Sequence, residues 1–467
     1  MSDVKGIRNH FSLQILRFFM HLVGMWPVKN MREQLISDIL LFYIAMVVIL
    51  ALMIETLDFY YSWGDLHAIS YNAPTTITVA IEVLKLTKFM VNRSEVMSFN
   101  AYTEKTFWKQ TYSPEEYQIL NKCNRQSLKI VATHIFLMMC VVWMNLSIAI
   151  VESVGKNMSD RTLPFNLYFN LPFAETPYYE AAFVFESAAA MGVGICTTSF
   201  AGFLCTTNLY AAAQFKILQR KIEMTCYNNA TGIVRTEYSA RNNSPSADWW
   251  TLNPVIGLDK TDQTNFAKDI GKNENFYLSR LEVANKKNIT ADNARFENKN
   301  KETFALLRDC IIQHQRLIHY MERVENLFST IMLAQALGSI LEICFSGFQI
   351  LLGVGNSIMR TTLSVQFLIA AMVQLLLFSW SSHEIIIESQ EIAEAAYRAC
   401  WYGLEYTDEG KAFRQSLLII IARARKPCIL TVGKFAPMSL DTFTSVFNTS
   451  ISYFTILRQV NEEGMEE

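Results

Sequence analysis

The last apolar stretch of the sequence, residues 438–460, carries a regular series of polar side chains. Positions three or four residues apart share one face of a helix, and the polar residues recur at that spacing. They are Asp441, Ser445, Asn448, Ser452 and Gln459, with Thr455 or Ile456 between the last two. A helix surrounded by lipid has no use for such a row, because an unpaired polar group is costly in hydrocarbon. The pattern is typical of a helix that lines water.

The other side of the same helix is apolar. It carries Phe443, Val446, Phe447, Ile451, Phe454 and Leu457, which suit lipid or packed protein. One such helix encloses no water-filled space, so this interpretation implies several copies around an axis. Close helix packing is the alternative, because Ser and Thr also pack helices tightly and hydrogen-bond back to their own backbone. The segment alone supports the two interpretations equally.

The elements that must hold this helix are apolar blocks of about 20 residues, the length that crosses a hydrocarbon core. Seven are expected, at residues 34–57, 69–91, 128–151, 179–204, 329–352, 361–382 and 440–460. Glu82, Lys85 and Lys88 interrupt the second block. Hydrophobic residues make up 51% of the chain and cluster in these blocks, which indicates an all-helical membrane protein. A net charge of −2 excludes a strongly basic nucleic-acid-binding protein, and no cleavable signal peptide is expected.

Lys and Arg are distributed unequally between alternate loops. The loops between 57 and 69, 152 and 178, and 353 and 360, with the C-terminal tail, hold only Lys156, Arg161, Arg360 and Arg458 of the 41 basic residues. The positive-inside rule therefore predicts a cytosolic N-terminus and an extracellular C-terminus. This orientation is opposite to that of a G-protein-coupled receptor.

The same topology places Asn157 in an outer loop, where its Asn-Met-Ser sequon is open to glycosylation. No cysteine lies in an outer loop, so we expect no extracellular disulfide. The sequence carries no enzyme or metal motif: His383-Glu384 lacks the second His of a zinc-protease helix, and no Cys-x-x-Cys occurs. We therefore expect neither catalysis nor a cofactor.

We divide the chain into five parts. They are a cytosolic N-terminal segment (1–33), transmembrane helices one to four with a cytosolic extension (34–225), a largely disordered cytosolic insertion (226–301), helices five and six with cytosolic anchor helices (302–436), and the last span with a short extracellular tail (437–467).

Apolar residues at a helical period continue three spans into the cytosol, at 208–223, 303–328 and 383–404, and predict a further helix at 410–424. Their apolar faces need burial, which predicts a cytosolic bundle shared between subunits. Ser113 and Ser439 are predicted to begin helices.

Short motifs in these segments resemble those of the insect odorant receptor family. In the C-terminal part they lie at 417–427 (LLIIIARARKP), 433–437 (GKFAP), 439–443 (SLDTF) and 452–455 (SYFT). Others lie at 391–397 (EIAEAAY) with Trp401-Tyr402, 214–218 (QFKIL), 310–315 (CIIQHQ) and 171–173 (LPF) with Pro177. Each motif is short, but their order and spacing are specific, and together they cover most of the membrane part.

The resemblance implies a ligand-gated, non-selective cation channel of four subunits in the plasma membrane of sensory neurons. The last span of each subunit would line a central pore, here with Asp441, Ser445, Asn448, Ser452, Ile456 and Gln459. In the family a hydrophobic ring near the outer end of that span is the gate, and Ile456 is the matching residue. Such a ring closes by dewetting, while Asp441 would attract cations at the inner mouth.

The family has two kinds of subunit, a shared co-receptor and odour-tuned subunits, and the chain resembles each of them in part. Insertion 226–301 has a length similar to that of the family's shared co-receptor, whereas residues 310–328 and 457–460 are unlike it. We favour an odour-tuned subunit that forms a hetero-tetramer with odorant co-receptor subunits, binds a small volatile organic ligand and contacts membrane lipid. The alternatives are the homotetrameric co-receptor itself, a gustatory-type channel of the same superfamily, and a seven-span receptor or transporter without a pore of its own.

A volatile ligand needs a mostly apolar cavity with few polar anchors, which the family places in the outer half of the membrane among spans two to six. At that depth we expect ligand contacts, with helix packing as the alternative role of each residue, from Tyr71, Thr75, Thr78, Met139, Trp143, Leu146, Phe183, Ser187, Met191, Phe345, Gln349, Phe367 and Met372. Tyr168, Phe169 and Phe173 of an outer loop would cover the cavity. Glu82, Glu186 and Glu342 also lie within spans, but we assign none of them to the ligand, and Glu82 has Lys85 or Lys88 as a partner one turn away.

Overall fold

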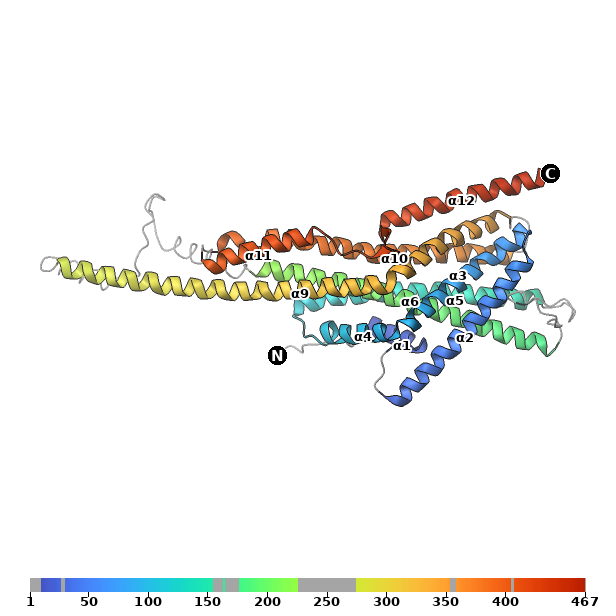
Figure 1. Ribbon diagram of the computed structural model, residues 1–467, viewed down its shortest axis with the longest axis horizontal. Coiled ribbons are helices and arrows are strands. Elements are labelled where there is room, and N and C mark those ends of the chain that lie inside the picture. The colour runs from blue at the N-terminus through green and yellow to red at the C-terminus, as the bar shows by residue number, and fades with distance from the viewer. Residues whose placement is uncertain are drawn as a thin grey trace. The chain divides into compact units, whose positions relative to one another are not determined.

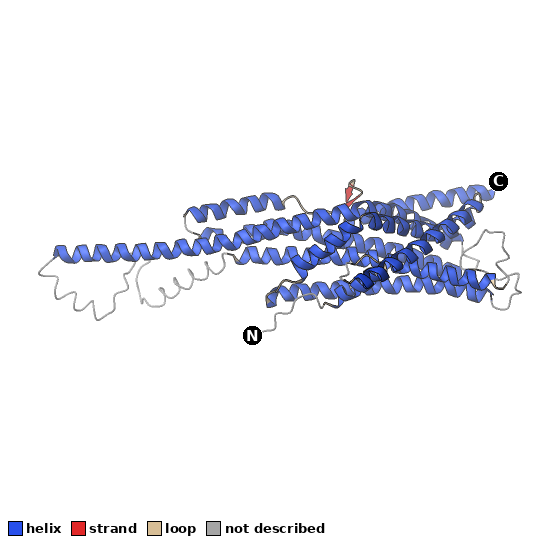
Figure 2. Ribbon diagram, turned by 60° about the horizontal axis from the view of Figure 1, so that its bottom comes forward, coloured by secondary structure: helices blue, strands red, loops and turns tan. Residues whose placement is uncertain are grey.

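The computed structural model describes residues 10–26, 30–153, 163, 176–225, 274–352, 358–404 and 407–466. These residues are mostly helical and include a two-stranded hairpin (Figures 1 and 2). The α-helices are α1 (Phe11–Leu22), α2 (Met31–Tyr61), α3 (Leu66–Val91), α4 (Arg93–Thr103), α5 (Pro114–Ser153), α6 (Tyr178–Met224), α9 (Glu274–Leu352), α10 (Ile358–Arg398), α11 (Asp408–Ala424) and α12 (Leu440–Glu466). The hairpin pairs β1 (Thr431–Val432) with β2 (Ala436–Pro437), and it directly precedes α12.

Each of the seven expected spans falls within one of these helices. Within the described ranges, five segments are long and apolar enough to cross a membrane: α2, α5, α6, residues 299–352 of α9, and α10. The predicted all-helical membrane fold is therefore confirmed. The helices α3 and α12 are less apolar, α3 because it contains Glu82, Lys85 and Lys88, so the count of seven spans stays a prediction. Within α3, Lys85 Nζ lies 2.7 Å from Glu82 Oε1 and both side chains are buried, which confirms that predicted pair.

The expected helix starts are confirmed by hydrogen bonds. At the start of α5, the Ser113 backbone N–H donates to Glu116 Oε2 at 2.8 Å, and the Glu116 N–H donates to Ser113 Oγ at 3.3 Å, which is a reciprocal capping box. Ser439 Oγ accepts from the Thr442 N–H at 3.4 Å where α12 begins. Both caps supply acceptors for backbone donors that have no partner inside the helix.

Two boundaries differ from the sequence-based expectation. The helix expected at 383–404 ends at Arg398, because Cys400 leaves the helical region (φ −70°, ψ 51°) before a short 3₁₀ turn at Trp401–Gly403. Residues 274–301 of the insertion, expected to be disordered, are the first part of α9. Their polar composition suggested disorder, but they contain neither Pro nor Gly to interrupt a helix. Residues 226–273, including Trp249-Trp250, lie outside the described residues.

The chain divides into two compact units. Unit 1 comprises residues 1–216, 317–389 and 427–467, and unit 2 comprises residues 217–316 and 390–426. Unit 1 has an aromatic core in which the Phe89 ring lies 4.8 Å from that of Phe200 and 5.7 Å from that of Phe328, measured between centroids. This core joins α3, α6 and α9, so the helices that surround the cavity described below are fixed to one another.

Unit 2 is built from the ends of α6, α9 and α10 together with α11. Arg398 Nε donates to Glu223 Oε1 at 2.8 Å, which joins α10 to α6. Asn300 Nδ2 donates to Thr407 Oγ1 at 2.9 Å, which joins α9 to the start of α11. The expected helical continuations of the spans are therefore present and pack against one another within one chain. Leu418 and Ile419 of α11 remain exposed on this unit.

A fall in pH is expected to destabilise unit 2 through His314. Burial, and then Arg423, lowers the pKa of this histidine from 6.5 to about 4. The folded state keeps His314 neutral, whereas the unfolded chain binds a proton below pH 6.5. The stabilisation present above pH 6.5 is therefore lost as the pH falls towards 4, by on the order of 3 kcal/mol in full.

Amide hydrogen exchange in α11 at pH 7.5 and 5.0, corrected for intrinsic rates, measures this loss. The variant His314→Gln should remove most of the pH dependence. His319→Gln, which changes an exposed histidine of the same helix, should leave it intact. An equal pH dependence in wild-type protein and in His314→Gln would contradict the assignment.

Candidate binding cavity and last helix

Unit 1 contains a cavity of about 90 Å³ between α2, α3, α5, α6, α9 and α10. Most of its wall is apolar, from Ala51, Ile54, Val79, Met138, Val141, Val142, Phe185, Ala189, Ala190, Val193, Gly194, Phe367, Ala370 and Ala371. The polar lining residues are Glu55, Thr75, Thr78, Asn145, Glu186, Thr197, Glu342 and Gln374. An apolar wall with few polar groups is the usual form of a small-molecule site.

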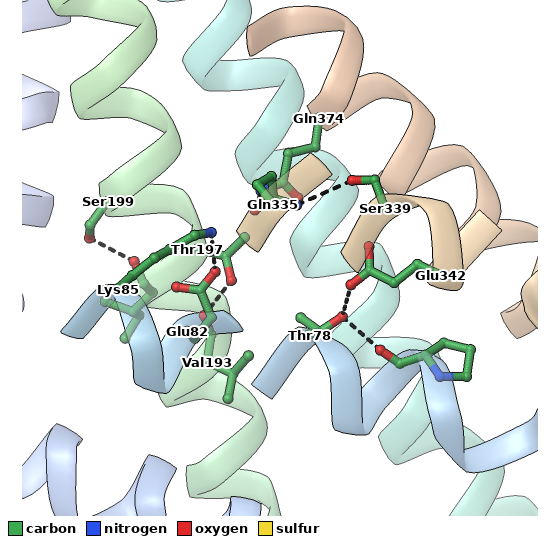
Figure 3. A network of polar contacts seen from close by, with 12 residues as sticks. Thr78, Glu82, Lys85, Val193, Thr197, Ser199, Gln335, Ser339, Glu342 and Gln374 are labelled. Carbon is green, nitrogen blue, oxygen red and sulfur yellow. Dashed lines mark hydrogen bonds and ion pairs between the residues drawn. The ribbon is translucent and has the colours of Figure 1, made fainter. Parts of the chain in front are cut away.

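Several polar groups of the cavity are already hydrogen-bonded. The Thr78 hydroxyl lies 2.7 Å from Glu342 Oε1 and 2.8 Å from the Pro74 carbonyl oxygen, so α3 and α9 are linked at the cavity wall (Figure 3). Thr197 Oγ1 donates to the Val193 carbonyl of its own helix at 2.8 Å. Gln374 Nε2 donates to Gln335 Oε1 at 3.2 Å. These bonds fix the side chains before any ligand binds.

The residues expected to contact a ligand divide into four groups. Thr75, Thr78 and Phe367 line the main cavity. Tyr71 and Gln349 line a neighbouring pocket of about 20 Å³ that Thr75 and Phe367 also border. Met139 and Met191 line a pocket of about 60 Å³ that Met138, Val142 and Gly194 of the main cavity also border. The others line none of these three pockets: Trp143, Leu146, Phe183, Ser187, Phe345 and Met372.

Several expected residues lie away from the cavity because their helices face it with a different side from the one expected. On α5 the cavity is lined by Met138, Val141, Val142 and Asn145, whereas the sequence favoured the next stripe, and Trp143 is 63% exposed. On α6 the cavity is lined by a stripe from Phe185 to Thr197, next to the expected stripe of Phe183, Ser187 and Met191. An almost wholly apolar span has no preferred side in its sequence. Asn145 and Glu186 were the available signal, because polar residues within a span face the protein interior.

Three carboxylates at the cavity were not assigned to a ligand. Glu186 and Glu342 were identified within spans but set aside, and Glu55 of α2 was missed because contacts were expected only from spans two to six. All three side chains are buried and line the cavity. Residues Asn157, Tyr168, Phe169 and Phe173 lie outside the described residues.

The polar side of α12 is exposed in the single chain. The structure leaves each of the predicted pore residues solvent-exposed, namely Asp441, Ser445, Asn448, Ser452, Ile456 and Gln459. On the opposite side Val446 is buried and Phe443, Phe447, Phe454 and Leu457 are half-buried, while Ile451 is exposed. A Cβ atom added at Gly347 would lie 3.5 Å from the Phe454 ring, which shows how closely α12 approaches α9 there. The helix therefore packs on its own subunit through its apolar side.

The hydroxyl groups of this exposed side bond to the helix backbone. Ser445 Oγ donates to the Asp441 carbonyl at 2.9 Å, and Ser452 Oγ donates to the Asn448 carbonyl at 3.0 Å. This is the hydrogen bonding expected from the packing alternative, and it satisfies the hydroxyl protons. The hydroxyl oxygens remain exposed and can still accept hydrogen bonds from water.

The hairpin before α12 is held on α9. Glu325 accepts hydrogen bonds from the Thr431 backbone N–H, at 2.8 Å, and from the Thr431 hydroxyl. The Gly433 N–H donates to the Ser329 carbonyl at 2.9 Å. Gly433 has φ +62°, and an added Cβ would lie 2.7 Å from Leu333 Cδ2. Only glycine satisfies both the backbone conformation and the close approach.

The variant Gly433→Ala is therefore expected to destabilise unit 1 by about 2–4 kcal/mol, from backbone strain and overpacking. Thermal unfolding of the detergent-solubilised protein measures the change. Gly192→Ala is the matched control, because its Cβ would meet only Val48 Cγ2 at an ordinary 3.6 Å. Equal midpoints for Gly433→Ala and Gly192→Ala would contradict the role given to Gly433.

Comparisons with known proteins agree with this architecture. Residues 65–451 match a family model described as "7tm Odorant receptor". The chain is 31% identical over 157 residues to Odorant receptor Or2 of Anopheles gambiae, covering 34% of this chain and 40% of the relative. It is 34% identical over 166 residues to Odorant receptor 10 of Aedes albopictus, covering 35% and 41%. The chain thus spans about two fifths of the length of the curated relatives it matches.

A solved structure shows the same fold over nearly the whole chain. It is that of the insect olfactory receptor OR5 from Machilis hrabei in complex with eugenol, with a TM-score of 0.69. The match covers 96% of this chain and 97% of that one at 13% sequence identity. At this low sequence identity, the likeness shows a shared fold alone.

Proposed function

Because the chain belongs to the insect odorant receptor family of multi-pass membrane proteins, we propose that it is an odorant-sensing subunit of a ligand-gated, non-selective cation channel. The exposed polar side of α12 carries this proposal. A polar stripe that faces away from its own subunit needs water or neighbouring subunits beside it, because lipid leaves its polar groups unpaired. Four copies of α12 around an axis would supply both, and ions would pass between them.

In this proposal the chain crosses the membrane seven times, with its N-terminus in the cytosol. The main cavity of unit 1 binds the odorant, and unit 2 holds the subunits together through the exposed apolar residues of α11. Ile456 closes the pore by dewetting, and rotation of α12 brings polar groups such as Gln459 into its place. The partner subunits are odorant co-receptors, and the complex acts in the plasma membrane of sensory neurons.

Expression in cells that lack other odorant receptors tests the proposal. The chain is expressed alone and with a co-receptor, and whole-cell currents are recorded during exposure to a panel of volatiles. We expect an odorant-evoked cation current only when both subunits are present. Equal currents from the chain alone would favour the homotetrameric alternative. Second-messenger signalling without any conductance would contradict a channel function.

A further inference from the structure

The cavity lining carries an excess of acidic over basic groups. The charged residues on its lining are Glu55 of α2, Glu186 of α6 and Glu342 of α9, and their side chains are only 7%, 2% and 6% exposed. Among the described lining residues there is no Lys, Arg or His. Lys85, whose field reaches Glu342, is already bound to Glu82 at 2.7 Å. A buried carboxylate without a cationic partner is costly, so a cationic ligand would be favoured here.

Glu55 has a vacant acceptor oxygen, although the Thr76 hydroxyl bonds to its carboxyl group. Its Oε2 has no hydrogen-bond partner among the described residues. Asp58 and Glu186 are the charged groups that act on it, and both are acidic. Glu342 differs, because neither of its oxygens is buried without a partner, and its Oε1 is bonded to the Thr78 hydroxyl. A buried acceptor of this kind, on the wall of a mostly apolar cavity, indicates where the polar head of a ligand binds.

On the basis of the function proposed above, we propose that this cavity binds a small amine as its ammonium ion, with the nitrogen donating to Glu55. The ammonium group supplies the missing donor and the missing positive charge together, as a charge-assisted hydrogen bond. An alcohol supplies a donor but no charge. An ester, ketone or aldehyde offers an acceptor but neither the donor nor the positive charge.

The size and the rest of the wall define the ligand further. A cavity of about 90 Å³ holds roughly six to nine water-sized groups at ~10–15 Å³ each. This volume fits a short alkyl or phenylethyl amine. Phe185, Phe367 and Met138 provide an apolar and aromatic surface for such a tail. A metal ion is not a candidate, because the described residues contain no group of three ligands placed to hold one.

Three ligands of nearly equal shape separate the possibilities: 2-phenylethylamine, 2-phenylethanol and phenylacetaldehyde. Binding is measured as thermal stabilisation of the purified full chain, and currents are recorded from cells that also express a co-receptor. We expect 2-phenylethylamine to bind at least tenfold more tightly than the alcohol, and the aldehyde to bind most weakly. The variant Glu55→Gln should remove the preference for the amine while it keeps the side-chain volume.

Two controls accompany this variant. Glu342→Gln, whose oxygen is already hydrogen-bonded, should retain most of the preference, and Glu115→Gln, an exposed carboxylate outside the cavity, should retain all of it. Tighter binding of the alcohol or aldehyde, or an unchanged preference in Glu55→Gln, would overturn the proposal. Currents evoked by the alcohol but not by the amine would sink this proposal and leave the channel function standing. Amine binding without any current would support this proposal and contradict the channel function.

Discussion

The variant Ile456→Ala is expected to raise the resting conductance of the assembled channel at least tenfold, which corresponds to ~1.4 kcal/mol of barrier. Ile456 is 56% exposed in the single chain and lies one helical turn from Ser452 on the exposed side of α12. In the proposed tetramer its side chains form an apolar ring that water leaves when the pore is closed. Alanine shortens every member of the ring, so water and ions enter without odorant.

Whole-cell current in the absence of odorant measures this effect. Ile451→Ala is the matched control, because Ile451 is also exposed but lies outside the row of predicted pore residues, and it should leave the resting current unchanged. If Ile456→Ala left both the resting current and its block by pore blockers unaltered, the gate would have to lie elsewhere.

The second large effect concerns the cavity. Ala189→Phe adds an aromatic ring to a buried lining position of a cavity of only about 90 Å³. We expect the odorant concentration for half-maximal current to rise at least 100-fold, which is ~2.7 kcal/mol of lost binding. Resting conductance should not change, because the pore helix does not line this cavity.

Dose–response curves for any activating odorant measure the shift, and surface labelling confirms that the variant reaches the membrane. Phe367→Ala, which enlarges the same cavity, should also change the sensitivity. Trp143→Ala is the control, because this exposed residue lies outside the cavity wall. Normal sensitivity in Ala189→Phe would place the ligand in another site.

Much of the fold follows from local sequence signals. Apolar blocks of membrane-spanning length and the caps at Ser113 and Ser439 indicated the helices and where two of them begin, since these features act within one helix. The exposed side of α12 was readable for the same reason: its polar and apolar residues alternate at the helical period. The motifs in 417–455 then indicated the family.

The cavity was harder to predict because it depends on how helices rotate against one another. Spans such as 128–151 are apolar on nearly every side. Neighbouring helices decide which side faces inward, so the spacing of apolar residues in the sequence does not reveal it. The carboxylates would have been the better guide, although none was assigned to the ligand. Glu55, Glu186 and Glu342 are costly in lipid and therefore turn to the interior. The helix at 274–301 was missed because a polar composition resembles that of a disordered segment.

The most direct measurement of the central claim is chemical labelling of α12 in the working channel. Cysteine is introduced singly at Ser445, Ser452 and Gln459, and at the buried Val446 as a control. A positively charged, water-soluble thiol reagent is then applied while odorant-evoked current is recorded. We predict that modification at the three polar positions changes the current and that Val446→Cys is inert. If all three were unreactive in a complex that still answered odorant normally, ions would not pass along this helix.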